Sequence, residues 1–155
     1  MDPLSPIQPE EIILRRVPKQ RGMSLDLKSV QPGAFTPNEH DTDGLSVHRA
    51  GIHTSKQVAQ DFRGGKGTQP VWVAHLRASD ILALGVTIQP NAVPESTDPP
   101  RPAQPGHALI PEMNAGNATS NQTEERKRLL AEAVFRVDGP FDPPPPKASP
   151  APATG

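Results

Sequence analysis

Cysteine is absent from this 155-residue sequence. Disulfides, thiolate zinc sites, iron–sulfur clusters and cysteine nucleophiles are therefore excluded. Aromatic residues are scarce as well, with four phenylalanines, one tryptophan and no tyrosine, so we expect a core built mainly from Ile, Leu, Val and Ala. The net charge of −1 gives the chain no overall attraction to nucleic acid or to an anionic membrane.

Long apolar segments are missing too. No run of about 18 apolar residues predicts a transmembrane helix, and the first residues, "MDPLSPIQPEE", lack the basic and then apolar layout of a signal peptide. We therefore expect a cytoplasmic protein that does not associate with membranes.

Proline, in contrast, is abundant, and its 21 copies are unevenly distributed. They crowd residues 1–9, 90–105 and 140–152, and hydrophobic residues make up only 34% of the chain. Setting these segments aside leaves about 100 to 110 residues, a size that suits one folded domain.

The expected organisation is a Pro-rich lead-in at residues 1–9, a single domain at 10–138 with a Pro-rich loop insertion at 91–106, and a disordered Pro-rich tail at 139–155. The tail contains "DPPPPK", which could dock on an SH3-like or WW-like groove as a preformed polyproline helix. Such tails more often serve as solubilising linkers.

Short apolar or alternating segments predict the strands. "EIILRRV" (11–17) ends before Pro18, which cannot donate to a neighbouring strand. "GLSVHRA" (44–50) places Leu45 and Val47 on one face, and Ser46 and His48 on the other. Further strands are expected at "PVWVAHLRA" (70–78), "VTIQP" (86–90) and "GHALIP" (106–111).

Capping residues and apolar spacing predict the helices. Short helices are expected at residues 55–62 and at residues 80–85, the second capped by Ser79. Thr123 is predicted to cap a longer helix over "EERKRLLAEAVFRV" (124–137).

The predicted fold class is α+β, a small single domain with a mainly antiparallel sheet of four to six short strands, short helices and a C-terminal helix. The candidate core residues are Ile12, Leu14, Leu45, Val47, Val71, Val73, Leu76, Ile81, Leu84, Val86, Ile88, Leu109, Leu130 and Val134.

Five histidines raise the question of a metal or proton-transfer site. Imidazoles and carboxylates together suit Zn, Fe or Mn, but His48 and His53 are five residues apart, which is not the spacing of two ligands on a helix. His53 is expected in the turn before a helix, apart from His48 on its strand. We favour scattered surface histidines, with the face that bears Ser46 and His48 turned towards water, and expect no metal and no cofactor.

One alternative keeps the histidines together. If the strands that carry His48, His75 and His107 pair with one another, three imidazoles could converge on one face of the sheet. Such a trio would be ionisable near neutral pH.

Two segments resemble anion-binding sequences. "RRVPKQR" (15–21) has four basic residues in seven, which is typical of nucleic-acid contacts and of solvated strand ends. No aromatic residue is interleaved for base stacking, so we favour the solvated strand end and keep nucleic acid as an alternative partner. "RGGKGT" (63–68) lacks the Walker spacing and is interpreted as a helix-to-strand connection, with a weak backbone contact to an anion as the alternative.

A covalent mechanism has little support in the sequence. No Gly-x-Ser-x-Gly motif is present for a serine nucleophile. An ADP-ribosyl-transfer site would need a first-strand arginine or histidine, a hydroxyl motif and a late glutamate. Arg15 or Arg16, Ser46 and Glu112 could be arranged to fit, but only by three free choices.

Several segments taken together resemble a set of small, uncharacterised bacterial proteins. They are "LRRVP", "AFTP", "DGLSVHR", "VAHLRASDILALGVTIQP" and "GHALIPEMN". The resemblance covers about residues 12–114 and departs at Gly33-Ala34, where a serine-rich run is expected. It implies one small bacterial domain decorated by the Pro-rich insertion and tail, and it assigns no catalytic residue, cofactor or partner.

Two functions of different classes follow from the sequence. The first is a non-enzymatic binding or accessory protein that acts through a protein partner, which predicts an exposed apolar or sheet-edge patch. The alternative is a small enzyme on a nucleotide or nucleic-acid substrate, with His48, His75, His107, Arg15 and Arg16 as candidate site residues. It predicts at least two imidazoles within about 7 Å of each other in a cleft. The sequence leaves open whether the protein is an enzyme.

Overall fold

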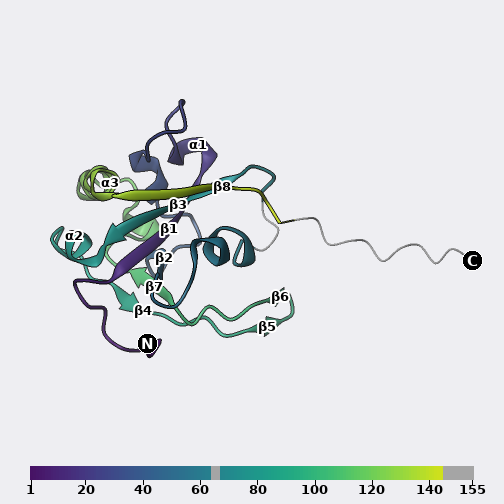
Figure 1. The fold of residues 1–155 in the computed structure, drawn as a ribbon. Coiled ribbons are helices and arrows are strands. Elements are labelled where there is room, and N and C mark those ends of the chain that lie inside the picture. Colours follow the sequence, from purple (N-terminus) through teal and green to yellow (C-terminus); the bar gives the residue numbers. More distant parts are fainter. Residues whose placement is uncertain (64–66, 145–155) are drawn as a thin grey trace, which may run out of the picture.

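A computed structural model describes residues 1–63 and 67–144 of the chain. Its centre is an antiparallel sheet of six strands in the order β4-β7-β2-β1-β3-β8 (Figure 1). These strands are β1 (Ile12–Pro18), β2 (Leu45–Arg49), β3 (Val71–Arg77), β4 (Gln89–Pro90), β7 (His107–Ile110) and β8 (Arg136–Phe141). The predicted α+β class with a mainly antiparallel sheet is confirmed.

The central strand β1 is paired unequally with its two neighbours. It pairs with β3 at all seven of its residues, but with β2 at only two positions, Ile13 with Arg49 and Leu14 with His48. Beyond Leu14 the two strands diverge. The Arg15 guanidinium reaches across, and its Nη1 donates to the carbonyl of Ser46 on β2 at 2.8 Å.

The longest helix is α3 (Asn121–Ala133). Ser120 caps it, because its Oγ accepts from the N–H of Thr123 at 3.1 Å. The helix ends before the predicted limit of residue 137, since Arg136 and Val137 pair with β3 as the start of β8. The other helical segments are short: α1 (Lys19–Gly22), η1 (Pro32–Phe35), η2 (Gln57–Asp61), α2 (Ala78–Leu82) and η3 (Ala115–Asn117).

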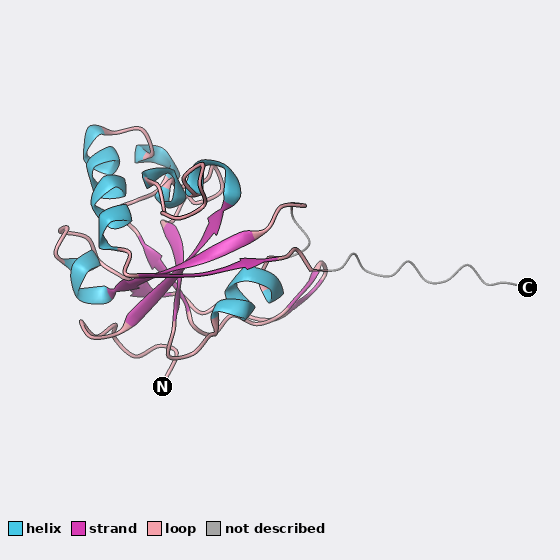
Figure 2. Ribbon diagram, turned by 45° about the horizontal axis from the view of Figure 1, so that its top comes forward, coloured by secondary structure: helices cyan, strands magenta, loops and turns pink. Residues whose placement is uncertain are grey.

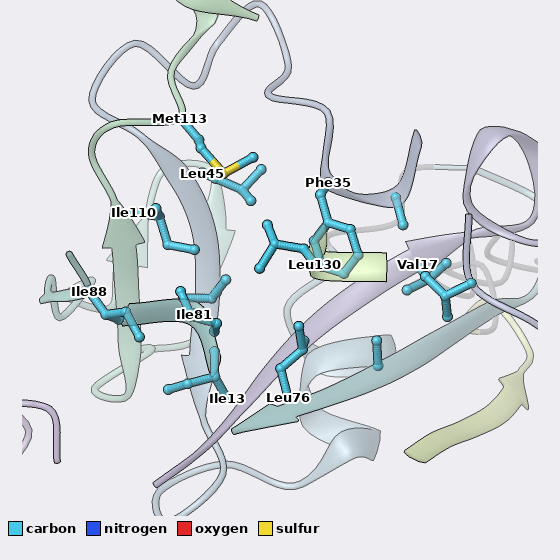
Figure 3. Packing of buried hydrophobic residues seen from close by; sticks show 14 of the residues in the cluster. Ile13, Val17, Phe35, Leu45, Leu76, Ile81, Ile88, Ile110, Met113 and Leu130 are labelled. Atoms are coloured by element: carbon cyan, nitrogen blue, oxygen red, sulfur yellow. The ribbon is translucent and has the colours of Figure 1, made fainter. Parts of the chain in front are cut away.

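Apolar clusters cover both faces of the sheet. In the larger cluster, Figure 3 shows side chains of the sheet, such as Ile13 and Leu76, converging with Phe35 of η1 and Leu130 of α3. On the other face, Leu14 packs with Val58 of η2. Figure 2 shows α3 and η2 on opposite sides of the sheet. The two faces follow from the alternation of Ile13 and Leu14 along β1.

Most of the predicted core residues are buried. The exceptions are only half-buried: Ile12, Leu84, Leu109 and Val134. The sequence also missed part of the core, because Phe35, Ala59 and Met113 come from segments without a regular apolar pattern.

Two Pro-rich segments have defined conformations. Residues 1–9 lie against Arg49, whose guanidinium donates to the carbonyl of Ser5 at 2.8 Å. The insertion at residues 91–106 contains a projecting two-stranded hairpin, β5 (Ser96–Thr97) and β6 (Pro100–Arg101), seen apart from the main sheet in Figure 1.

The expected tail is ordered at its start. Gly139 to Phe141 belong to β8, and the carbonyl of Asp142 accepts from the Gln60 side chain at 3.0 Å. Residues 145–155, which hold most of the proline-rich run, lie outside the described residues.

Candidate functional site

A cleft of about 830 Å³ opens where β1 and β2 diverge. Its lining comes from the second half of β1, from α1, from residues 33–40 and from β2. This volume falls within the range of about 300–1,000 Å³ that is usual for small-molecule sites. The basic residues of the lining are Arg15, Arg16, Arg21, His40 and His48.

A close backbone contact shapes one wall of the cleft. A Cβ on Gly33 would lie only 2.2 Å from the carbonyl oxygen of Arg21, so no side chain fits at this position. Arg21 itself has a φ of 69°, in the left-handed region that most residues avoid. This close approach of η1 to α1 gives a physical reason for glycine at residue 33.

Arg15 is fixed at the base of the gap. Its Nε donates to the carbonyl of Ala34 at 3.0 Å, and its Nη1 donates to that of Ser46. For Nη2 the described part of the chain shows no hydrogen bond. Burial lowers the pKa of Arg15 to about 10, although Asp41 partly opposes this change, so the guanidinium stays charged at neutral pH.

Arg16 leaves β1 on the face opposite to that of Arg15, as expected for adjacent strand residues, and both line the cleft because it lies in the gap beside β1. Its Nη1 makes one long hydrogen bond, 3.4 Å, to the carbonyl of Val58 in η2. Burial lowers its pKa, and repulsion from Arg63 lowers it further. Neither Arg15 nor Arg16 forms an ion pair with any carboxylate in residues 1–63 and 67–144.

Arg49 shows how this fold neutralises a buried arginine. Its Nε and Nη2 each lie 2.9 Å from one carboxylate oxygen of Glu11, and its remaining N–H groups donate to the carbonyls of Pro3, Ser5 and Pro6. This bidentate pair supplies both charge and geometry. Among the described residues, neither Arg15 nor Arg16 forms such an ion pair, and only the more distant Asp41 favours the charge of Arg15, so both guanidinium groups can engage a ligand in the cleft.

The structure brings His48 and His107 together, and adds His53. The ring centroids of His48 lie 5.3 Å from His107 and 5.7 Å from His53, and the ring stacks on Phe62 at 5.3 Å. The expectation that His48 faces water is wrong, because η2 and Phe62 cover it and only 8% of its surface is exposed. The cluster combines β2 and β7 with the turn that carries His53.

Hydrogen bonds fix which ring nitrogens carry protons in two of these histidines. The amide oxygen of Gln104 and the carbonyl of Asn91 can only accept, so His48 donates from Nε2 at 2.9 Å and His107 donates from Nδ1 at 2.9 Å. Burial lowers the pKa of His48 to about 3. The pKa of His107 is lowered mainly by burial as well. His48 therefore lines the cleft as a neutral imidazole.

The sequence predicted that His53 lies in a turn apart from His48. The structure confirms the turn, but the turn brings the His53 ring into the same cluster. The backbone N–H of Gly106 donates to its Nε2 at 2.8 Å, and a Cβ on Gly106 would lie 2.6 Å from the ring. Burial lowers the pKa of His53. Gly106, immediately before the strand of His107, permits this close packing. The glycine alone does not indicate that the ring packed against it is that of His53.

His75 shares the face of His48 but not its cluster. Leu14 on β1 pairs with His48 on one side and with His75 on the other, so it lies between them. The two histidine backbones are therefore two strand spacings apart, about 10 Å. The imidazole of His75 instead bonds Asp138 of β8 at 2.8 Å. The predicted convergence of all three imidazoles is therefore wrong for His75.

Ser55 also contacts His75 and Asp138, yet the geometry is not that of a nucleophile and its base. The Ser55 hydroxyl donates to Asp138 Oδ2 at 2.6 Å, and the same oxygen accepts from His75 Nε2. The imidazole thus offers no lone pair to the hydroxyl. Burial alone raises the pKa of Asp138, but hydrogen bonds from Ser55, Arg136 and His75 lower it overall. The hydrogen bonds among Ser55, His75 and Asp138 connect the segment just before η2 to β3 and β8.

The other sequence candidates are dispersed. Ser46 lines the cleft with Arg15 and Arg16, whereas Glu112 is absent from its lining and accepts from the backbone N–H of Thr87 at 2.9 Å. This separation removes the support for an ADP-ribosyl-transfer arrangement. Of the "RGGKGT" segment, residues 64–66 lie outside the described residues.

Neither a metal cluster nor a membrane span is found where the structure describes the chain. There, no group of three or more His, Asp and Glu residues is arranged to hold a metal ion. No helix of these residues combines the length and apolar composition needed to cross a bilayer. Comparison of the chain with protein-family models, curated proteins and solved structures finds no match.

Proposed function

We propose that this protein binds a small anionic ligand in the cleft between β1 and β2, with Arg15 and Arg16 as the principal partners of the anion. The observation that carries the proposal is the pair of partly buried guanidinium groups that lack a carboxylate partner among the described residues. Buried charges in proteins are ordinarily paired, because desolvation of an isolated charge is costly. An anionic ligand supplies the missing charge.

The geometry of Arg15 supports binding rather than random solvation. Two carbonyl oxygens, from Ala34 and Ser46, hold its Nε and Nη1 in place. Little side-chain entropy is then lost when a ligand engages the remaining donors, and this preorganisation favours affinity. Phosphate is the preferred anion, since guanidinium donors match its oxygens in paired hydrogen bonds.

Titration calorimetry with inorganic phosphate and with pyrophosphate tests the proposal. We expect saturable binding that weakens as salt is added, because the ion pairs are only partly shielded from solvent. Arg16→Gln is expected to weaken binding by about tenfold or more, the usual effect of losing a hydrogen bond to a charged group.

Arg101→Gln is the matched control, since Arg101 is exposed on β6 and absent from the cleft lining. It should leave binding unchanged. Absence of binding by both anions, or equal affinity in wild type and Arg16→Gln, would contradict the proposal. Circular dichroism checks that each variant is folded.

A second candidate function, binding of a protein partner, is favoured by the loop between Met23 and Val30. Its ends form a β-bridge, and the N–H of Ser24 donates to the carbonyl of Ser29 at 2.9 Å. This closed loop leaves Leu25 fully exposed. Transfer of one leucine from water into an interface stabilises a complex by about 1.5–3 kcal/mol.

Affinity capture from the host with wild type, Leu25→Asp and Leu4→Asp tests this candidate. Leu4 is a matched control, being another exposed leucine outside the loop. A partner held by wild type and Leu4→Asp but lost by Leu25→Asp is the expected result. A partner that Leu25→Asp retains in full, or no partner at all, would rule the loop out.

A further inference from the structure

The lining of the cleft is chemically uneven. Its guanidinium groups come from β1 and α1, and two of them, Arg15 and Arg16, lie on the strand itself. The segment that follows η1 contributes a hydroxyl, an amide and a carboxylate, from Thr36, Asn38 and Glu39. An anion is attracted by the first region and repelled by the carboxylate of the second.

The cleft is also larger than a phosphate ion needs. Its volume is about 830 Å³, whereas a phosphate occupies only a few times the roughly 30 Å³ share of one water molecule. Neutral His48 adds hydrogen-bonding capacity but no positive charge. The remaining space is therefore suited to an uncharged polar group with hydrogen-bond donors.

A nucleic-acid strand fits this lining poorly. Single-strand sites combine a basic groove with aromatic side chains that stack on successive bases. In the described part of the chain, the cleft lining contains neither Phe nor Trp, and Glu39 would oppose a second or third phosphate.

From these observations, and resting on the anion site proposed above, we infer that the ligand is a hydroxylated phosphate ester of the sugar-phosphate class. Its phosphate lies with Arg15 and Arg16, and its hydroxyls donate to the polar segment that contains Asn38 and Glu39. Each hydroxyl donates to an oxygen, and the carboxylate of Glu39 is the strongest acceptor in that segment.

Titration calorimetry with four probes tests the inference: ribose 5-phosphate, inorganic phosphate, ribose and a ten-residue oligothymidylate. Ribose 5-phosphate is expected to bind at least about tenfold more tightly than phosphate, consistent with the gain of one or more hydrogen bonds to a charged acceptor. Ribose and the oligonucleotide are expected to bind more weakly than the ester.

Glu39→Gln separates the two regions of the site. Because Glu39 is exposed and its ion pair is with the equally exposed His40, this change is compatible with folding. It should reduce the advantage of ribose 5-phosphate over phosphate about fivefold or more, while phosphate affinity does not fall. Glu95→Gln, on the exposed hairpin, is the matched control and should change neither affinity.

Each outcome decides between the two proposals. Equal binding of phosphate and ribose 5-phosphate, tightest binding of the oligonucleotide, or an ester preference that Glu39→Gln leaves intact would overturn the sugar-phosphate inference and retain the anion site. Failure of the ester, phosphate and oligonucleotide alike to bind would overturn the anion site as well.

Discussion

At the scale of single residues, burial sets the charge of the ionisable groups. His48 lies beneath Phe62, and loss of water around its ring lowers its pKa to about 3. The hydrogen bond to Gln104 opposes this shift, while His107, His53 and Arg16 add to it through charge repulsion. His40, which shares the cleft lining, is almost fully exposed. Two histidines of the same cleft lining thus differ in environment, because His48 is buried and His40 is exposed to solvent.

The stability of the fold should therefore depend on pH. An imidazole in the unfolded chain takes up a proton near pH 6.5, but His48 in the folded chain does so only near pH 3. Between these values the unfolded state binds more protons, so the free energy of unfolding falls as pH decreases, by about 1.4 kcal/mol per pH unit for each such group. Urea denaturation at pH 7, 6 and 5 measures this slope.

The variant His48→Gln identifies the group responsible. Its amide can still donate to Gln104 but does not titrate, so the slope should become shallower by about one proton. The matched change His40→Gln, at an exposed position, should leave the slope as in wild type. Identical slopes in wild type and His48→Gln would exclude the buried imidazole as the source.

At the scale of elements, one ion pair fixes the start of the chain to the sheet. Arg49 on β2 bonds Glu11, which immediately precedes β1, and it also donates to the carbonyls of Pro3, Ser5 and Pro6. Both side chains of the pair are buried, at 1% and 8% exposure. The Pro-rich segment at residues 1–9 is therefore attached through backbone carbonyls as well as through Ile7, which packs against the main apolar cluster.

Arg49→Met is expected to destabilise the protein by about 3–5 kcal/mol, because it leaves the Glu11 carboxylate buried without a partner. The double variant Arg49→Met/Glu11→Leu should recover part of this loss, since no unpaired charge remains. Urea denaturation measures both changes.

Arg128→Met is the control, because Arg128 pairs with Glu125 and Glu132 on the exposed surface of α3. Loss of such surface pairs costs at most about 1 kcal/mol. If Arg49→Met were no more destabilising than this control, the buried pair would have no special role in holding the N-terminal segment.

The elements differ in how far the sequence reveals them. Apolar alternation or β-branched runs predict β1, β2, β3 and β7 close to their observed bounds. The sequence of β8 resembles the start of a disordered tail, because Gly139 and Pro140 interrupt it. Its strand conformation depends on pairing with β3 at the sheet edge, where a proline is tolerated. Such pairing is tertiary information that local propensity lacks.

At the scale of the whole molecule, strand order decides which candidate residues meet. The sequence identified Arg15, Arg16 and His48, and all three line one cleft. The sequence could not show that His75 lies outside this cleft. That separation follows from the strand order β2-β1-β3, which places Leu14 between His48 and His75. The sequence also did not identify residues 36–40 as part of the cleft, because they follow η1, which packs close to α1 at Gly33 and Arg21 only in the folded chain.

The short contact between β1 and β2 has a mechanical consequence. Two residue pairs join two three-stranded leaves, β4-β7-β2 and β1-β3-β8, into one sheet. A rotation about this narrow seam would change the width of the gap at Arg15 while the seven pairs between β1 and β3 stayed intact. Opening the sheet at its centre would therefore break the hydrogen bond between Arg15 and Ser46 but would leave the longest ladder of the sheet intact.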